Sequence, residues 1–401
     1  MNKKLSSSTL KHSILIITPA LSGGGWISIE EPIIELIKEV KSFKVIVVAL
    51  GPAKHKSKIY SLFRLPYFNY SGIVGFIVNL NPLFTTLYYI PLVILSFFLL
   101  LIYRPTILLC NGFCSALFSS PLAKIMKIKI IVSYHGEIEH YLGKLTKKII
   151  NIFSRFIDIV LVNSEGSKMD VIPIMDNPKK VIVVRHWANK IFFSMTKKYR
   201  EMIKQRMRLQ NKFVVLYVGE ISHEKLAHLL LYVIEKLSKF EDFLDFYFIF
   251  VGTGSLIYKI REFERKFQNI KHFEYTSNRE KLLEFYAVAD IVWSFADTTY
   301  LARPAVEALA TGTPVIIPDL PTIYKKAQQN IRIPHDLIPK DIGWIVNADD
   351  IDNIADFLLQ IKRQNMIDDF IRFKCQSYAR SLHSPVNMKI IIETIKQLCE
   401  K

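Results

Sequence analysis

Short apolar runs rich in β-branched residues recur along the chain, and each is followed by a segment with helical spacing. The runs are apolar throughout instead of alternating with polar residues, which is typical of parallel strands covered by helices on both faces. The first half contains six runs, at 13–18, 44–50, 106–110, 129–133, 158–162 and 180–185. The second half contains six more, at 213–218, 246–251, 270–275, 290–295, 313–317 and 343–346. Two such series predict an α/β protein with two Rossmann-like domains, each on a mainly parallel sheet.

The domain boundaries follow from this pattern. A chain of 401 residues exceeds what one core usually holds, and the polar helical stretch 194–211 between the two series predicts a linker. We therefore expect a first domain at 1–193 and a second at 194–380. A C-terminal helix at 381–401, after the break at Ser384-Pro385, is expected to cross back to the first domain.

A glycine cluster follows the first predicted strand. The glycines 23–25 come shortly before Ser28, which can cap a helix whose first turn would hold Glu30, Glu31 and Pro32. Free backbone N–H groups at a helix start, with no Cβ in the way, suit an anion. The cluster therefore predicts a phosphate-facing loop, with a simple turn as the alternative.

The positive charge of the chain belongs to its first half. The net charge is +17, of which residues 1–200 contribute +16 and residues 201–401 contribute +1. Between Val40 and Gly136 there are ten Lys or Arg residues and no acidic residue, and positions 65–103 carry no charge at all. Basic residues around an apolar, aromatic segment favour an anionic membrane surface over nucleic acid as the partner.

The segment 84–103 is apolar and long enough to span a bilayer. It lies where a crossover helix is required between two strands, and Pro91 interrupts it, so a buried helix, an interfacial helix and a transmembrane helix are three alternatives. We favour the interfacial helix, because tyrosines and basic residues are typical of that position. The residues predicted to face the membrane are Lys54, Lys56, Lys58, Arg64, Tyr88, Tyr89, Lys124 and Lys127.

The number and spacing of the cysteines indicate the cellular compartment in which the protein is expected. Cys110, Cys114, Cys375 and Cys399 are too few and too scattered to cross-link a chain of this length, which fits a reduced, cytoplasmic setting. Cys110 and Cys114 lack a second ligand pair, so we expect no metal there. The expected location is cytoplasmic, with peripheral attachment to the membrane.

One string in the second half is the most specific motif of the chain. It runs from Arg303 to Ile317, where a helix carrying Glu307 ends near Gly312 and leads into a strand. The string resembles the Glu-Ala-x-Ala-x-Gly-x-Pro-Val-Ile motif of the retaining glycosyltransferases of family 4. That family has the GT-B fold, in which two Rossmann-like domains face each other and the active site lies in the cleft between them.

Further segments resemble the same family in the same order. They are the glycines 23–25, Tyr134-His135-Gly136, the segment 160–164, the segment 218–225 with Lys225, the turn 251–254 and the segment 289–294. The resemblance implies transfer of a sugar from a nucleotide-diphosphate sugar to an acceptor, with retention at the anomeric carbon and without a metal or other cofactor.

The resemblance also implies roles for individual residues. Glu307 would hold the ribose, Lys225 would neutralise the leaving diphosphate, and His135 would contact the donor sugar near the reacting centre. The other positions predicted to bind the donor are Gly23, Gly24, Gly25, Gly219, Gly252, Gly254, Tyr275 and Arg303.

Two positions depart from the family pattern. The partner acid expected eight residues before Glu307 is Thr299, and the arginine expected before Lys225 is Glu220. Arg303 is our candidate for the missing positive charge. Thr299 and Glu220 favour one alternative to a transferase, a catalytically silent binding or scaffold subunit. A nucleotide-sugar epimerase of the same two-domain architecture is a second alternative. An NAD enzyme is disfavoured because the turn at Gly252 and Gly254 lacks a third glycine.

The basic, apolar first half and the family motifs together predict the acceptor. In this fold the first domain binds it, so we expect a lipid-linked glycan or glycolipid at the cytosolic face, and no nucleic acid.

Overall fold

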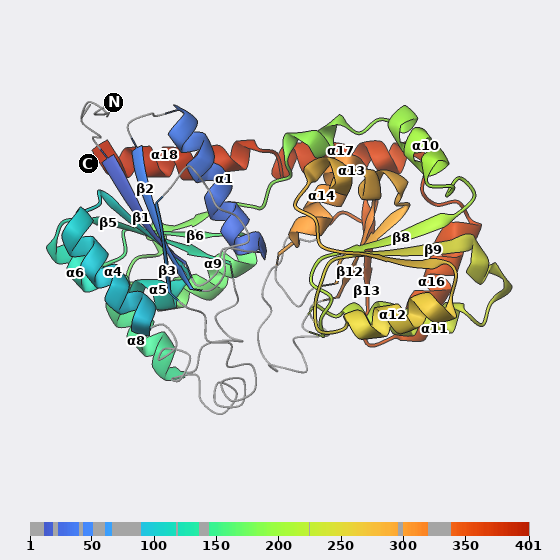
Figure 1. Ribbon diagram of the computed structural model, residues 1–401, viewed down its shortest axis with the longest axis horizontal. Helices are drawn as coiled ribbons and strands as arrows, with labels where there is room; N and C mark the ends of the chain where they lie inside the picture. The colour runs from blue at the N-terminus through green and yellow to red at the C-terminus, as the bar shows by residue number, and fades with distance from the viewer. Residues whose placement is uncertain are drawn as a thin grey trace, which may run out of the picture. The chain divides into compact units, whose positions relative to one another are not determined.

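The computed structural model describes residues 12–18, 23–39, 43–50, 61–65, 90–117, 119–135, 144–223, 225–295, 300–319 and 338–400. The chain forms two compact units, residues 1–185 with 388–401, and residues 186–387. Each unit is an α/β domain on one parallel sheet (Figure 1).

The unit boundaries differ from those expected from the sequence. The second unit begins at His186 instead of residue 194 and extends to Asn387 instead of residue 380. Its first residues pack within it, because the Ala188 N–H donates to the His383 carbonyl oxygen at 3.0 Å. The stretch 194–211 is not a free linker either: it contains α10 (Lys197–Arg206), whose Ile203 is 1% exposed.

The first unit has seven strands in the order β3-β2-β1-β4-β5-β6-β7, and every pair is parallel. The sequence analysis missed β3, a short edge strand that Arg64 interrupts. The strands are β1 (His12–Thr18), β2 (Phe43–Leu50), β3 (Ser61–Leu65), β4 (Ile107–Asn111), β5 (Lys129–Tyr134), β6 (Ile159–Val162) and β7 (Val181–Val183). The helices are α1 (Gly23–Glu39), α4 (Ile90–Tyr103), α5 (Phe113–Leu117), α6 (Ser120–Ile125), α8 (Lys144–Ser154), α9 (Glu165–Val171) and α18 (Val386–Glu400).

Helix α1 begins earlier than predicted. It starts at Gly23, so the three glycines form its first turn and Pro32 lies in its interior, where the sequence analysis had placed the start. Ile29, Ile33 and Leu36 are all buried. This buried face includes Ile29 of the predicted first turn, and its packing compensates for the hydrogen bond that Pro32 cannot donate.

Helix α4 forms the second part of the uncharged segment. Its Leu99 and Leu100 are buried in the core with Leu15 and Ile46 of the sheet, so it is a packed crossover helix. Its opposite side exposes large apolar side chains at helical spacing: Ile94, Phe97, Phe98, Leu101 and Ile102. Among the residues that the structure describes, no helix is long and apolar enough to cross a membrane.

The second unit has six parallel strands in the order β10-β9-β8-β11-β12-β13. The strands are β8 (Phe213–Val218), β9 (Phe246–Val251), β10 (Ile270–Phe273), β11 (Ile291–Trp293), β12 (Val315–Pro318) and β13 (Gly343–Val346). The helices are α10, α11 (Ala227–Leu237), α12 (Ile257–Lys266), α13 (Arg279–Val288), α14 (Arg303–Thr311), α16 (Ile351–Arg363) and α17 (Asp369–Leu382).

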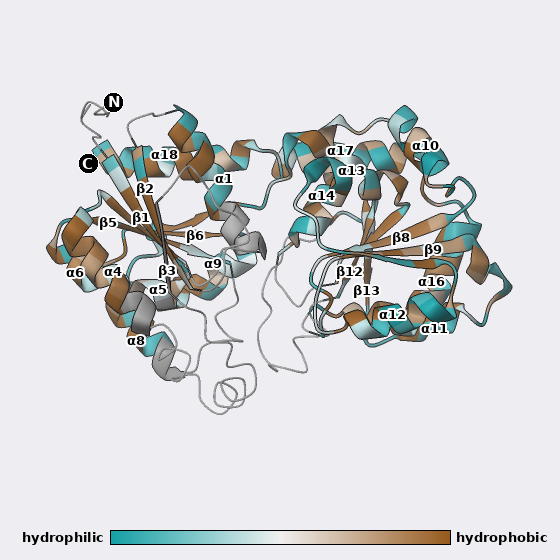
Figure 2. Ribbon diagram, in the orientation of Figure 1, coloured by the Kyte–Doolittle hydropathy of each residue, from teal (hydrophilic) through white to brown (hydrophobic). Residues whose placement is uncertain are grey.

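Both faces of this second sheet are buried. Val214 and Leu216 of β8 pack with α10, α13, α14 and α17, whereas Val215 and Tyr217 pack with α11, α12 and α16. Figure 2 shows the corresponding distribution, with hydrophobic strands and helices that are polar on part of their surface. The uninterrupted apolar pattern of the strands follows from this double burial.

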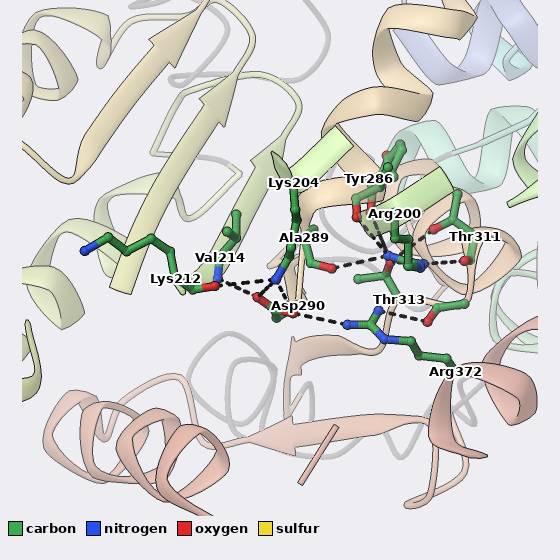
Figure 3. A network of polar contacts seen from close by, with 12 residues as sticks. Arg200, Lys204, Lys212, Val214, Tyr286, Ala289, Asp290, Thr311, Thr313 and Arg372 are labelled. Atoms are coloured by element: carbon green, nitrogen blue, oxygen red, sulfur yellow. Dashed lines mark hydrogen bonds and ion pairs between the residues drawn. The ribbon is translucent and has the colours of Figure 1, made fainter. Parts of the chain in front are cut away.

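A buried arginine joins the ends of two helices in the second unit (Figure 3). Arg200 of α10 is 8% exposed and donates to the carbonyl oxygens of Tyr286, Ala287 and Ala289 at 3.1–3.4 Å, at the C-terminus of α13. It also donates to the Thr311 carbonyl oxygen at the C-terminus of α14 and to Thr313 Oγ1. A cation is favourable at helix C-termini, where carbonyl oxygens lack partners in the helix.

The electrostatics of Arg200 reflect its burial. Burial lowers the pKa of its guanidinium well below the usual value, Arg372 lowers it further, and Asp290 raises it. Asp290 lies beside the arginine and accepts from Lys204 at 2.7 Å and from Arg372 at 3.2 Å. The same carboxylate accepts from the Val214 N–H at the start of β8, so this polar network links α10, α17 and the sheet (Figure 3).

Replacing Arg200 should destabilise the second unit strongly. In Arg200→Met several buried carbonyl oxygens lose their donor, each costing about 1–3 kcal/mol, so we expect a loss of roughly 3 kcal/mol or more in the free energy of unfolding. Denaturant unfolding of the full chain measures it. The control Lys198→Met removes an exposed charge from the same helix and should change the free energy of unfolding little; equal effects of the two variants would contradict the role given to Arg200.

Candidate functional site

The strand order of the second unit reverses at one point. The chain proceeds from β8 to β9 and β10 on one side and returns to β11 on the other side of β8. In open α/β sheets, ligands bind outside the carboxyl ends of the strands at such a reversal. The turn 219–226 after β8 and the segment after β11 flank this point; residues 296–299 of that segment, including Thr299, lie outside the described residues.

Glycines bring the turns after β8 and β9 into backbone contact. The Gly219 N–H donates to the Val251 carbonyl oxygen at 3.0 Å, and the Ile221 N–H donates to that of Thr253 at 2.9 Å. A Cβ on Gly252, whose φ is +153°, would lie 1.8 Å from the Gly219 oxygen. Close packing of the two turns therefore requires glycine at position 252. Ligand contact by Gly219, Gly252 and Gly254 stays a prediction.

Lys225 lies in the turn between β8 and α11. Its backbone N–H donates to Ser222 Oγ at 3.3 Å, and among the described residues its ammonium forms no ion pair. The next residue, Leu226, has φ 53° in the left-handed region, which costs a side-chain-bearing residue roughly 1–2 kcal/mol. Strain of this kind collects at functional turns. Glu220 is exposed in the same turn, and its backbone oxygen accepts from the Tyr217 hydroxyl at 2.6 Å.

Glu307 is a buried acid with two partners on α13. Its side chain is 4% exposed; Arg279 Nη1 lies 3.1 Å from Oε1, and the Tyr286 hydroxyl donates to Oε2 at 3.0 Å. Burial raises the pKa of Tyr286 well above its usual value, and the charge of Glu307 raises it further. These partners lie 28 and 21 residues away on another helix, so the local motif around Glu307 does not reveal them.

The other predicted donor residues of the second unit are Arg303 and Tyr275. Arg303 opens α14, with its guanidinium carbon 5.7 Å from the centre of the Trp187 ring and Nη1 3.5 Å from the Trp187 carbonyl oxygen. The side chain of Tyr275, just after β10, is 52% exposed. Donor contact by either residue stays a prediction.

The first unit has a polar cluster at its own reversal of strand order, between β1 and β4. Asn111 Nδ2 donates to Thr18 Oγ1 at 3.0 Å, which joins the carboxyl ends of these two strands. His135 follows β5, and its Nε2 lies 2.7 Å from Ser133 Oγ. The sequence analysis found His135 but missed Thr18 and Asn111, although each is the last residue of a strand next to the reversal.

The predicted membrane-facing residues fall into three groups. Lys124 and Lys127 are exposed, and Lys124 pairs with Asp158 at 3.1 Å. Arg64 lies in strand β3, and its side chain is not among those that the structure describes. The remaining residues, Lys54, Lys56, Lys58, Tyr88 and Tyr89, lie outside the described residues. Within the described part of the chain, no group of three or more metal-binding side chains comes together.

Two Rossmann-like units with these parallel sheets define the GT-B class of fold, which confirms the fold predicted from the sequence. Residues 199–374 match the family model of glycosyl transferases group 1. The match lies within the second unit and includes the β8–α11 turn, Arg279 and Glu307. That part of the chain is therefore similar in sequence to group 1 glycosyltransferases.

The chain is also similar to individual glycosyltransferases in sequence or in structure. The chain is 26% identical over 250 residues to the sulfoquinovosyl transferase SQD2 of Arabidopsis thaliana, and the aligned stretch spans 58% of this chain and 44% of that protein. The solved structure of Anabaena Alr3699/HepE with UDP and glucose has a TM-score of 0.68 at 15% identity, covering 96% of this chain and 99% of its own. For WaaG, a glycosyltransferase involved in lipopolysaccharide biosynthesis, the TM-score is 0.60 at 11% identity, with 95% and 99% covered.

Proposed function

We propose that the protein is a retaining, metal-independent glycosyltransferase of family 4 that takes its sugar from a nucleotide-diphosphate sugar. The observation that carries the proposal is a buried, doubly hydrogen-bonded Glu307 within a stretch that matches glycosyl transferases group 1. Alr3699/HepE has been solved with UDP and glucose, which supports a nucleotide-sugar donor. The donor would bind outside the carboxyl ends of β8 and β11, where the strand order reverses.

The proposed chemistry depends on stabilising the leaving group. Departure of a nucleoside diphosphate builds negative charge, which a fixed cation and backbone N–H groups stabilise. Lys225 is the cation we assign to this task, because its ammonium has no ion pair among the described residues. Glu307 would bind the ribose, and His135 of the first unit would contact the transferred sugar.

The acceptor we propose is a lipid-linked glycan or glycolipid, reached by peripheral attachment to the cytosolic face of a membrane. Helix α4 exposes Ile94, Phe97, Phe98, Leu101 and Ile102, within a stretch of the chain that contains basic residues and no acid between Val40 and Gly136. Apolar side chains framed by basic ones suit an anionic bilayer surface. WaaG, which has the same fold, is involved in lipopolysaccharide biosynthesis.

A catalytically silent binding subunit is the second candidate. It is favoured by Glu220 and Thr299, which stand where the related family has an arginine and a glutamate. Such a subunit would bind nucleotide weakly or not at all and would release none from a nucleotide sugar.

Lys225 should act on the diphosphate alone. Calorimetric titration should show that Lys225→Met weakens UDP binding by about tenfold or more, since a hydrogen bond to a charged group contributes roughly 1.5–3 kcal/mol, and leaves uridine binding unchanged. Lys239→Met removes an exposed lysine from the same unit and should have no effect. Equal weakening of UDP and uridine would refute the assignment.

The exposed face of α4 should hold the protein on anionic vesicles. The double variant Phe98→Asp with Ile102→Asp should reduce co-flotation with phosphatidylserine-containing liposomes at least tenfold, because burying each large apolar side chain contributes about 1.5–3 kcal/mol. The matched control, Phe370→Asp with Phe373→Asp, changes two similarly exposed aromatics, 61% and 64%, in the second unit. Flotation that both double variants leave intact would rule out this face as the attachment site.

A further inference from the structure

Two residues of helix α13 contact the two oxygens of the Glu307 carboxylate. Arg279, the first residue of α13, reaches Oε1 at 3.1 Å, and Tyr286, two turns further along, reaches Oε2 at 3.0 Å. The exposed fractions of the side chains differ: 27% for Arg279 and 4% for Glu307. The ion pair therefore extends from the protein surface into the core, with the acid at its inner end.

Tyr286 is itself held at both of its ends. Its ring is fully buried and packs edge-on against Phe192, with centroids 5.6 Å apart. Its backbone oxygen accepts from Arg200, while its hydroxyl contacts Glu307 and the Pro304 carbonyl oxygen. The hydroxyl thus has a fixed position, which in turn fixes the plane of the carboxylate.

A carboxylate held in this way is suited to a pair of neighbouring hydroxyls. It has about four lone-pair positions, so it can accept from protein donors and from ligand hydroxyls at the same time. The Arg279 guanidinium lies 3.1 Å from this carboxylate, and an opposite charge within hydrogen-bonding distance favours the charged form. Without that cation, a buried carboxyl group tends to take up a proton and lose acceptor positions.

We infer that Arg279 and Tyr286 are positioning residues that hold the Glu307 carboxylate ionised and oriented for the 2′- and 3′-hydroxyls of the donor ribose. The inference rests on the proposed function and deepens it, since it assigns ribose recognition to three residues of α13 and α14. It also separates that task from binding of the diphosphate, which is assigned to Lys225 in the turn after β8.

The test compares two ligands that differ by one hydroxyl, UDP and 2′-deoxy-UDP, by calorimetric titration of the full chain. Wild type should bind UDP about tenfold or more tightly than 2′-deoxy-UDP, the value of one hydrogen bond to a charged group. In Arg279→Gln this ratio should fall toward one, while the affinity for 2′-deoxy-UDP changes less than that for UDP. Arg279→Lys should restore part of the ratio, and Tyr286→Phe should lower it.

A matched control is available on the same helix. Lys281 is exposed two residues after Arg279, so Lys281→Gln should keep the wild-type ratio. Equal weakening of both ligands in Arg279→Gln, or an unchanged ratio, would overturn the inference while leaving the proposed function intact. Failure of the wild type to bind UDP, GDP or ADP would overturn the proposed function, and the inference with it.

Discussion

The second unit depends on a single buried cation. Arg200 donates to carbonyl oxygens at the C-termini of both α13 and α14, so the two helices end at one common point. Burying a guanidinium is unfavourable unless its N–H groups are satisfied. Within the described part of the chain, carbonyl oxygens and the Thr313 hydroxyl accept from Arg200, and no carboxylate pairs with it directly. The desolvation cost of burying the Arg200 guanidinium is offset, because without it the carbonyl oxygens at the ends of two helices would be buried and unpaired.

The position of Glu307 in the candidate site depends on the same helix junction. Tyr286 accepts from Arg200 through its backbone and donates to Glu307 through its hydroxyl, so the junction of the helices and the acidic site share one residue. Arg279 at the opposite end of α13 completes the contacts to Glu307. A contact made for stability in the core thereby sets the geometry of a group proposed to bind ligand.

The sequence was sufficient to predict the fold, because strands buried on both faces are apolar without interruption and the helices between them have clear spacing. β3 was not recognised because Arg64 interrupts its apolar run. The start of α1 was predicted too late because Pro32, expected in the first turn, lies inside the helix. Glu307 was recognisable from its motif. Arg279, Tyr286 and Arg200 were not, since their contacts lie between 18 and 113 residues away and leave no local spacing.

We propose that the carboxyl ends of β8 and β11 bind a nucleotide-diphosphate sugar, although Glu220 stands where the related family has an arginine. Thermal unfolding of the wild-type chain against UDP-, GDP- and ADP-sugars tests it most directly. A ligand at a hundredfold excess over its Kd stabilises the folded state by about 2.7 kcal/mol, which raises the melting temperature by several degrees. We expect such a rise with at least one of these nucleotide sugars; no rise with any of them at millimolar concentration would contradict donor binding at this edge.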